Sequence, residues 1–460
     1  MAEPDPDIDP VTGRPWTPWQ RACRSLARRL PRTARAFHRS RAALRHLAGR
    51  IWHRIRQVGR TARWISASIR RLVALRREQR ITVAVDVTPL WEPLTGIGWY
   101  LYRLLEHVAD RDDLALRLYG PTAIDSTDRQ RPVVPLPAGP AIEERLWPVP
   151  DDLAVPAGWV IRCLRRLEPF VLALEGNRVL FAPNFFLPRR FALARGRRVA
   201  TIHDLGVRRV PWTLQAETLD ALQAKLERTV RSARLLISVS AAIRDELVEL
   251  GLASAEKVRV VHHGPGQLAA VEPTGLPPGV PEIYALHVGT LEPRKNVLLL
   301  LEAWRELRRR DPGAPVLVLC GKYGWRSEQI ETQVRAAERE GWAVHAGYVE
   351  EGELSALYRR AALVVFPSLY EGFGLPAVEA QHAGTPLVCS DLPVLREVAG
   401  DGALFAPVDD PVGLAAAVHR VLSEEDLRKR LIAAGARSVA RLSWRDAARD
   451  TAEVWREAAR

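Results

Sequence analysis

The chain has 460 residues, of which 47% are hydrophobic and 26% charged; this length predicts two or three domains and the composition is that of a globular protein. No run of about 18 apolar residues occurs, so no membrane-spanning helix is expected. The net charge of +13 lies in one segment, because residues 1–80 carry +15 and the other 380 residues carry −2. With no zinc-type Cys/His spacing and no basic-aromatic motif, the sequence does not predict a nucleic-acid partner.

The beginning of the chain, residues 1–30, is expected to be disordered. Its first ten residues, MAEPDPDIDP, are acidic and proline-rich, which is unlike a signal peptide. The four cysteines lie far apart, so a disulfide framework is not expected and a reducing compartment fits. A cytoplasmic location is therefore predicted.

Residues 31–80 form a basic amphipathic pattern. Apolar residues recur every three or four positions, and arginines fill nearly all the other positions. This predicts a long helix on the inner face of the cell membrane, with arginines on anionic headgroups and Trp52 and Trp64 at interfacial depth. The near-heptad spacing also allows a coiled coil with a protein partner, although such seams normally carry opposite charges beside them. A solvated tail is the third possibility.

Residues 81–265 are predicted to form a first Rossmann-like domain. A β-branched strand at 81–90 leads through a glycine turn into an amphipathic helix within 92–109, which is the opening of such a domain. Residues 120–160 are proline-rich and are expected to be irregular. Further elements are predicted along this half: strands at 198–202, 235–239 and 258–261, and a helix at 214–231.

A second Rossmann-like domain is predicted at residues 281–440, after a Gly- and Pro-containing linker at 264–281. Strands and helices alternate along it, which predicts a parallel sheet covered on both faces. Residues 441–460 are expected to form a final helix. The fold class is therefore α/β, with two doubly wound domains facing across a cleft, and the cleft at the carboxyl ends of the strands is the expected ligand site.

Two candidate site segments lie in the first domain. The GIG turn places Gly96 and Gly98 after the first strand, where the loop could close over phosphates, although GxG alone is a weak signal. In TIHDLG, His203 and Asp204 follow a strand at its cleft-facing end. A lone histidine is more often structural, but this position favours a role in the site.

Adjacent cations lie at the start of the second domain. Arg294 and Lys295 in VGTLEPRKN follow a strand and are predicted to open a helix. Helix starts favour acidic residues, so two cations here are unexpected for a purely structural helix start. They suit a diphosphate whose negative charge grows as it leaves.

The segment SLYEGFGLPAVEA, residues 368–380, places Glu371 and Glu379 with seven residues between them around a glycine turn. Gly372 and Gly374 are expected to let the backbone approach a ligand, and the following helix start offers N–H groups to an anion. Carboxylates accept hydrogen bonds from paired hydroxyls. Together these features predict a nucleotide sugar, with hydroxyls at both ends and a diphosphate between. By itself the spacing also fits a helix charge and a solvated loop residue.

A metal site is not predicted. Outside the first 80 residues Asp-x-Asp occurs only at Asp110–Asp112, at the end of a helical pattern. Arg294 and Lys295 can replace the cation that metal-dependent transferases use.

These motifs resemble those of the retaining, nucleotide-sugar-dependent glycosyltransferases of family 4, which have the GT-B fold. The resemblance covers about residues 82–458. In the second half VGTLEPRKN, VVFPSLYEGFGLPAVEA, AGTPLVCSD and LREVAGDGALFAPVDD occur in family order. In the first half GIG, TIHDL and ISVSAAIRDEL match more loosely, and the closing SWRDAARDTAEVWREA is similar to the family's last helix, which crosses back onto the first domain.

The resemblance implies a role for each matching residue. It assigns Glu371 to the hydroxyls of the donor sugar and Glu379 to the ribose, while Arg294 and Lys295 stabilise the leaving diphosphate. The other assignments are donor-side backbone N–H groups at Gly372, Phe373 and Gly374, a phosphate loop at Gly96 and Gly98, and a place beside the sugar for His203 and Asp204. It also implies retention by front-face attack, with the leaving phosphate as base, and no resident cofactor.

The sequence therefore predicts an enzyme that moves a hexose, with mannose as a soft preference, from a nucleotide-diphosphate sugar to a saccharide or lipid-linked acceptor. Two alternatives stay open. One is a nucleotide-sugar epimerase or phosphorylase on the same fold, and the other is a non-catalytic GT-B scaffold. The base, the acceptor and the linkage are not encoded in any readable motif.

Overall fold

The computed structural model describes most of the chain after the arginine-rich segment, namely residues 80–91, 94, 96–120, 133–144, 172–173, 175–266, 268 and 271–460. The predicted disordered segment 1–30 and the predicted helix 31–80, apart from its last residue, lie outside the described residues. No helix in the described ranges is long and apolar enough to cross a membrane.

The first sheet is parallel throughout, with the order β3-β2-β1-β4-β5-β6-β7 among the described residues. Three of its strands, β1, β4 and β6, are short and, apart from Ile81, buried, as expected for a parallel sheet covered on both faces. The strands are β1 (Ile81–Asp86), β2 (Leu114–Tyr119), β3 (Ile142–Glu144), β4 (Val179–Ala182), β5 (Arg197–Ile202), β6 (Leu235–Ser238) and β7 (Val258–Val260).

The second sheet is also parallel, with the order β10-β9-β8-β11-β12-β13. Both sheets therefore have the doubly wound order in which the chain changes direction beside the first strand of the domain. Crevices at such switch points hold ligands in open α/β sheets. The strands are β8 (Tyr284–Val288), β9 (Val316–Cys320), β10 (Ala343–Gly347), β11 (Leu363–Phe366), β12 (Leu387–Ser390) and β13 (Leu404–Ala406).

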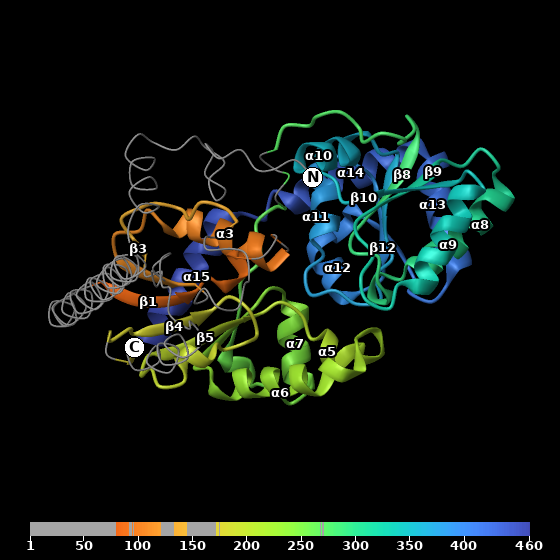
Figure 1. Cartoon of the computed structure of the whole chain (residues 1–460). Helices are drawn as coiled ribbons and strands as arrows, with labels where there is room; N and C mark the ends of the chain where they lie inside the picture. The colour runs from red at the N-terminus through yellow and green to blue at the C-terminus, as the bar shows by residue number, and fades with distance from the viewer. Residues whose placement is uncertain are drawn as a thin grey trace, which may run out of the picture. The chain divides into compact units, whose positions relative to one another are not determined.

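Helices cover the faces of both sheets (Figure 1). Those of the first half are α3 (Gly96–Val108), α5 (Gly206–Arg209), α6 (Ala216–Ser232) and α7 (Ala241–Glu249). Those of the second half are α8 (Val297–Arg310), α9 (Glu328–Arg339), α10 (Glu351–Arg360), α11 (Leu375–His382), α12 (Pro393–Ala399), α13 (Pro411–Ser423) and α14 (Glu425–Val439). The prediction of two α/β halves with parallel sheets is confirmed.

The last helix, α15 (Trp444–Ala459), leaves the second domain and packs beside α3 on the first sheet (Figure 1). Its apolar face joins the core of that domain. Trp455 is fully buried, and its ring lies 5.1 Å from the ring of Phe181 on β4. The first domain is therefore built from both ends of the described chain.

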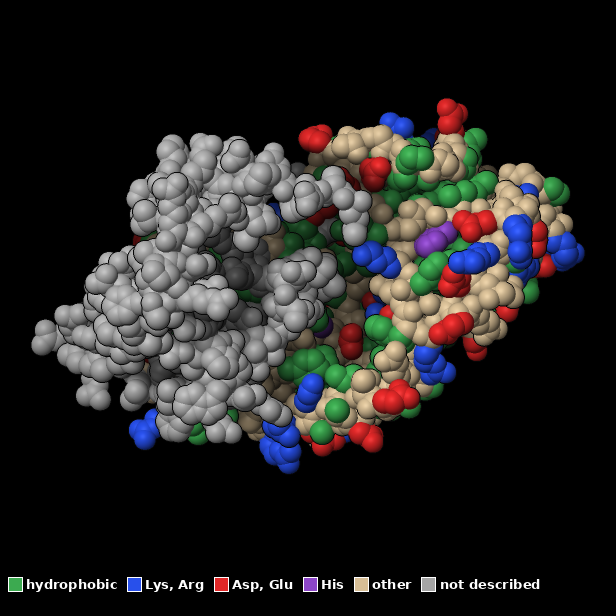
Figure 2. Space-filling view, viewed as in Figure 1, with side chains coloured by type: hydrophobic (Ala, Val, Ile, Leu, Met, Phe, Trp, Pro, Cys, Tyr) green, Lys and Arg blue, Asp and Glu red, His purple; other side chains and the backbone are tan. Residues whose placement is uncertain are grey.

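Charged side chains of both signs are mixed over the visible face of the described residues (Figure 2). This agrees with the net charge of −2 on residues 81–460.

Candidate active site

A pocket of about 430 Å³ is lined by residues of both domains, a volume within the range of roughly 300–1,000 Å³ that ligand sites occupy. It lies at the carboxyl ends of the strands. Ten of the eleven sequence-predicted site residues line it: Gly96, His203, Asp204, Arg294, Lys295, Glu371, Gly372, Phe373, Gly374 and Glu379. Gly98 is the exception.

The polar centre of the pocket is an ion cluster. Lys295 Nζ donates to Glu371 Oε1 at 2.6 Å, and Arg294 Nη1 lies 3.5 Å from Glu371 Oε2. Both Lys295 and Glu371 are only 8% exposed. Burial alone raises the pKa of Glu371, but Lys295 and Arg294 outweigh it and hold that pKa below its usual range. Glu371 is therefore ionised at neutral pH and able to accept hydrogen bonds.

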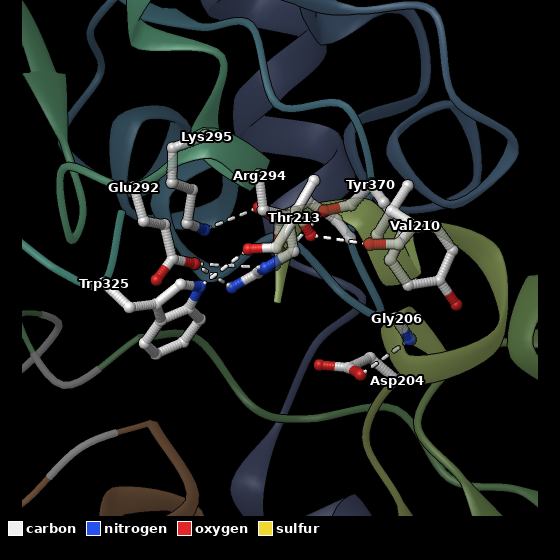
Figure 3. A network of polar contacts seen from close by, with 10 residues as sticks. Asp204, Gly206, Val210, Thr213, Glu292, Arg294, Lys295, Trp325 and Tyr370 are labelled. Carbon is white, nitrogen blue, oxygen red and sulfur yellow. Dashed lines mark hydrogen bonds and ion pairs between the residues drawn. The ribbon is translucent and has the colours of Figure 1, made fainter. Parts of the chain in front are cut away.

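Arg294 is held in place by its own domain. Its guanidinium donates to Glu292 Oε1 at 3.2 Å and to the backbone carbonyl of Tyr370 at 3.1 Å (Figure 3). Glu292 is 2% exposed, and its burial raises its pKa against the opposing effect of Arg294. Such a preorganised cation loses little freedom when an anion binds.

The two cations do not open the long helix, which corrects the prediction. They lie in a separate 3-10 turn, Pro293–Lys295, and α8 begins two residues later at Val297. Asn296 between them has a left-handed backbone, with φ of 57°. This short polar residue tolerates that conformation, so the chain turns before α8 and leaves both cations facing the pocket.

The glycine loop brings the two domains into contact. A Cβ on Gly372 would lie 1.7 Å from the carbonyl oxygen of His203, so only glycine fits there. The carbonyl of Gly372 accepts a hydrogen bond from Ser240 Oγ at 2.9 Å. Gly374 has φ of 89° and caps the start of α11. Close packing between the domains requires glycine at position 372, and a left-handed turn favours it at position 374. These are reasons for the two glycines in addition to access for a ligand.

Glu379 is the second buried carboxylate. It lies at the fifth position of α11, in the second turn, because the helix begins at Leu375. Its Oε2 accepts a hydrogen bond from Tyr358 Oη at 2.9 Å. Burial raises the pKa of Glu379 to about 7, and Tyr358 only partly offsets this. The other oxygen of Glu379 accepts no hydrogen bond from the described residues, and a carboxyl group with a shifted pKa in a pocket is a candidate ligand-binding group.

His203 and Asp204 follow β5 at the pocket's first-domain side. His203 Nε2 lies 2.7 Å from the carbonyl oxygen of Pro183, and since a carbonyl only accepts, Nε2 carries the hydrogen. Burial lowers the pKa of His203, so the neutral ring keeps a lone pair on Nδ1. Asp204 Oδ1 accepts the N–H of Gly206 at 3.0 Å (Figure 3).

The GIG segment is helical rather than a loop, because α3 already begins at Gly96. Gly96 lines the pocket near Leu375 of the other domain. Gly98 faces away from it, where a Cβ would lie 3.1 Å from the carbonyl oxygen of Pro89. Gly98 thus serves the packing of the helix start.

The domains also meet beside the pocket. Tyr370 Oη donates to Glu246 Oε2 at 2.7 Å and accepts the N–H of Leu205 at 3.0 Å. The indole N–H of Trp325 donates to the carbonyl oxygen of Thr213 at 2.8 Å (Figure 3). In each case a side chain of the second domain reaches the first.

The sequence did not point to several residues that line the pocket. They are mostly aromatic or basic and come from α3 and from the connections around β7, β8 and α15: Trp99, Tyr100, Arg103, His263, Gly266, Thr290 and Trp444. Two signals were present for them: Trp99 and Tyr100 follow the GIG turn directly, and His263 follows a predicted strand.

Neither Asp110 nor Asp112 lines the pocket. In the ranges that the structure describes, no three His, Cys, Asp or Glu side chains gather as metal ligands would.

Known families match both halves of the chain. The profile "Glycosyltransferase Family 4" matches residues 94–264, and "Glycosyl transferases group 1" matches residues 276–438. O-antigen chain mannosyltransferase B of Escherichia coli is 30% identical over 398 residues, covering 80% of this chain and 97% of that protein. A glycogen synthase of Mycobacterium tuberculosis is 33% identical over 269 residues, covering 57% of this chain and 63% of that protein.

Solved structures share the fold. A sucrose-phosphate synthase from Thermosynechococcus elongatus superposes with a TM-score of 0.64 at 21% identity, covering 82% of this chain and 99% of that one. Anabaena HepE, solved in complex with UDP and glucose, gives a TM-score of 0.59 at 16% identity, covering 82% of this chain and 100% of that one. The predicted family resemblance is thereby confirmed. With both halves matched and a relative at this identity along most of its length, the chain belongs to the family 4 glycosyltransferases and has the GT-B fold.

Proposed function

We propose that the protein transfers a hexose, specifically mannose, with retention from a nucleotide-diphosphate sugar to a saccharide or lipid-linked acceptor. The observation that carries this proposal is the Lys295–Glu371–Arg294 ion cluster in one pocket with the buried carboxyl of Glu379. The choice of mannose is supported by the E. coli relative, whose name describes a mannosyltransferase of the O-antigen chain.

The cations suit the diphosphate. Lys295 is buried, Arg294 is half-buried, and both are held by carboxylates, so an entering diphosphate would take over contacts that Lys295 now makes to Glu371. As the sugar–phosphate bond breaks, negative charge grows on the leaving group, and fixed cations stabilise it without reorganisation. We propose that these two side chains serve in place of a metal ion.

The carboxyl groups suit the hydroxyls at the two ends of the donor. Glu371, ionised and next to Phe373 and the loop backbone, would accept from hydroxyls of the hexose. Glu379, at the pocket wall formed by α11, would accept from the ribose. Each carboxylate can accept two hydrogen bonds from adjacent hydroxyls, which matches a sugar diol.

The acceptor would enter from the first-domain side, past His203 and α3. We assign no protein nucleophile, so attack on the face of the departing diphosphate, with a phosphate oxygen taking the acceptor proton, accounts for retention. The arginine-rich segment 1–80 would hold the enzyme at the inner membrane face, where lipid-linked acceptors lie.

A thermal-shift and calorimetry screen of the full chain against UDP- and GDP-sugars, without added metal, tests the donor site. A ligand at 100 times its Kd stabilises the folded state by about 2.7 kcal/mol, so selective stabilisation by one nucleotide sugar is expected. Glu379→Ala and Arg294→Ala should weaken that binding at least about tenfold, since each leaves part of the donor unpaired. Glu302→Ala and Arg420→Ala, on exposed faces of α8 and α13, are the matched controls.

No stabilisation of the folded wild-type chain by any nucleotide sugar would contradict the proposal and leave the scaffold hypothesis. Turnover of the donor to an isomeric nucleotide sugar without acceptor would instead favour the epimerase.

A further inference from the structure

His263 lines the pocket, and its two ring nitrogens have no hydrogen-bond partner among the described residues. It follows β7 and is 3% exposed. A buried polar side chain without a partner is costly, and a bound ligand, ion or water is one explanation for such a group in a native protein.

The ring is fixed by aromatic neighbours from both domains. Phe373 of the glycine loop stacks on it, with centroids 4.8 Å apart and an interplanar angle of 29°. Tyr100 lies 4.8 Å away, His203 5.5 Å and Trp444 5.7 Å. Because the ring is packed from several directions, its two nitrogens are held in place before a ligand arrives.

The ring is neutral at physiological pH. Burial lowers the pKa of His263 well below its ordinary value, and the nearby His203 and His262 lower it further. A neutral imidazole offers one donor and one acceptor. A hydroxyl group can pair with either of them, whereas a diphosphate oxygen only accepts and is better served by the cations Arg294 and Lys295.

The neighbours of His263 place it at the sugar end of the donor. It contacts Phe373, two residues from Glu371, and His203 beside the first-domain wall. We propose that His263 hydrogen-bonds a hydroxyl of the hexosyl group and so selects the donor by its sugar rather than by its nucleotide. This inference rests on the proposed function.

Calorimetry of the full chain with GDP and with GDP-mannose, repeated with UDP and UDP-glucose, separates the contribution of the sugar to the affinity from that of the nucleotide. His263→Phe keeps a flat ring for stacking and removes both nitrogens. It is expected to weaken binding of the nucleotide sugar about tenfold while changing the affinity for the nucleoside diphosphate less than about twofold. His263→Gln, which keeps a donor and an acceptor, should recover part of the loss. The matched control is His419→Phe on the exposed face of α13.

If His263→Phe weakens the binding of GDP and of GDP-mannose equally, the inference is overturned, because the nitrogens would then serve the nucleotide or the packing. Unchanged binding of both would overturn it too. If the wild-type chain binds neither pair of probes, the proposed function itself fails and this inference falls with it. A thermal melt of each variant shows whether the fold is kept. If His263→Phe does not fold, His263→Ala is measured instead, and it should lose affinity for GDP-mannose but not for GDP. Equal affinities to wild type for both ligands would overturn the inference.

Discussion

Glu379, which lines the pocket and is proposed to bind the ribose, opposes stability at neutral pH. Its pKa is raised from 4.5 to about 7 by burial, so the folded chain holds this proton more tightly than the unfolded chain does. The contribution of Glu379 to the free energy of unfolding is then highest below pH 4.5 and falls as the pH rises from 4.5 to 7. By linkage the loss approaches about 3 kcal/mol above pH 7.

Glu379→Gln is therefore expected to stabilise the protein at pH 8 by up to about 3 kcal/mol and to have little effect at pH 4. The same variant should bind the donor more weakly, since an amide has one acceptor oxygen where the carboxylate has two. Urea unfolding at the two pH values measures the first effect and calorimetry the second. Glu302→Gln on exposed α8 is the control, and an equal change at both pH values would contradict the argument.

The charged residues that line the pocket could be predicted from the sequence, whereas residues that reach the pocket through packing could not. Arg294, Lys295, Glu371 and Glu379 carry charges that are unexpected beside buried strands, so the sequence identified them. His263 gave no comparable signal, because its position depends on Phe373 and Tyr100, which are distant in sequence.

At the scale of elements, α7 begins against a carboxylate from the other domain. Glu397 on α12 accepts the N–H groups of Ala241 and Ala242 at 2.7 and 2.9 Å, and its Oε1 also lies 2.7 Å from His262 Nε2. Free N–H groups and the helix dipole favour a negative charge here. The contact joins the start of a first-domain helix to the second domain.

This contact should weaken in acid. Burial alone raises the pKa of Glu397, but His262 and the two N–H groups outweigh it and hold that pKa below 4.5. Its stabilising contribution is thus present above pH 4.5 and lost as the pH falls through the lower folded value. Hydrogen exchange at Ala241 and Ala242, corrected for intrinsic rates, should be less protected at pH 3 than at pH 6.

In Glu397→Gln that pH dependence should disappear. The amide of Ile243 is an internal control, because it donates to Ser240 Oγ within α7 instead. Identical pH profiles in wild type and variant would show that the carboxylate does not hold the helix start.

The elements themselves were predictable to different degrees. β1, β8 and β11 are runs of β-branched and apolar residues followed by glycine-rich turns, and the sequence located them. β2 was not predicted, and it contains the buried Arg117, whose guanidinium donates to the carbonyl of Glu175 at 2.8 Å and to Asn177 at 3.0 Å. β4 was not predicted either, although its four residues are all buried.

For the whole molecule, the positive charge of residues 1–80 beside a nearly neutral remainder predicts binding to an anionic membrane surface. A chain lacking residues 1–76 is expected to lose flotation with vesicles of anionic lipid while keeping its affinity for the nucleotide sugar. Each Arg near an anionic surface contributes about 1 kcal/mol, so binding should also fall steeply with salt and with neutral lipid. Unchanged flotation of the shortened chain would contradict a membrane role for the segment.

The position of α15 has a consequence for synthesis on the ribosome. The strands of the first sheet are translated before the second domain, but α15, which buries Trp455 against them, is translated after it. The second domain is complete once α14 has been translated, so it can fold before the first domain. Until α15 has been translated, the nascent chain presents an uncovered apolar face on its first domain, and a stop codon before α15 would leave that face open permanently.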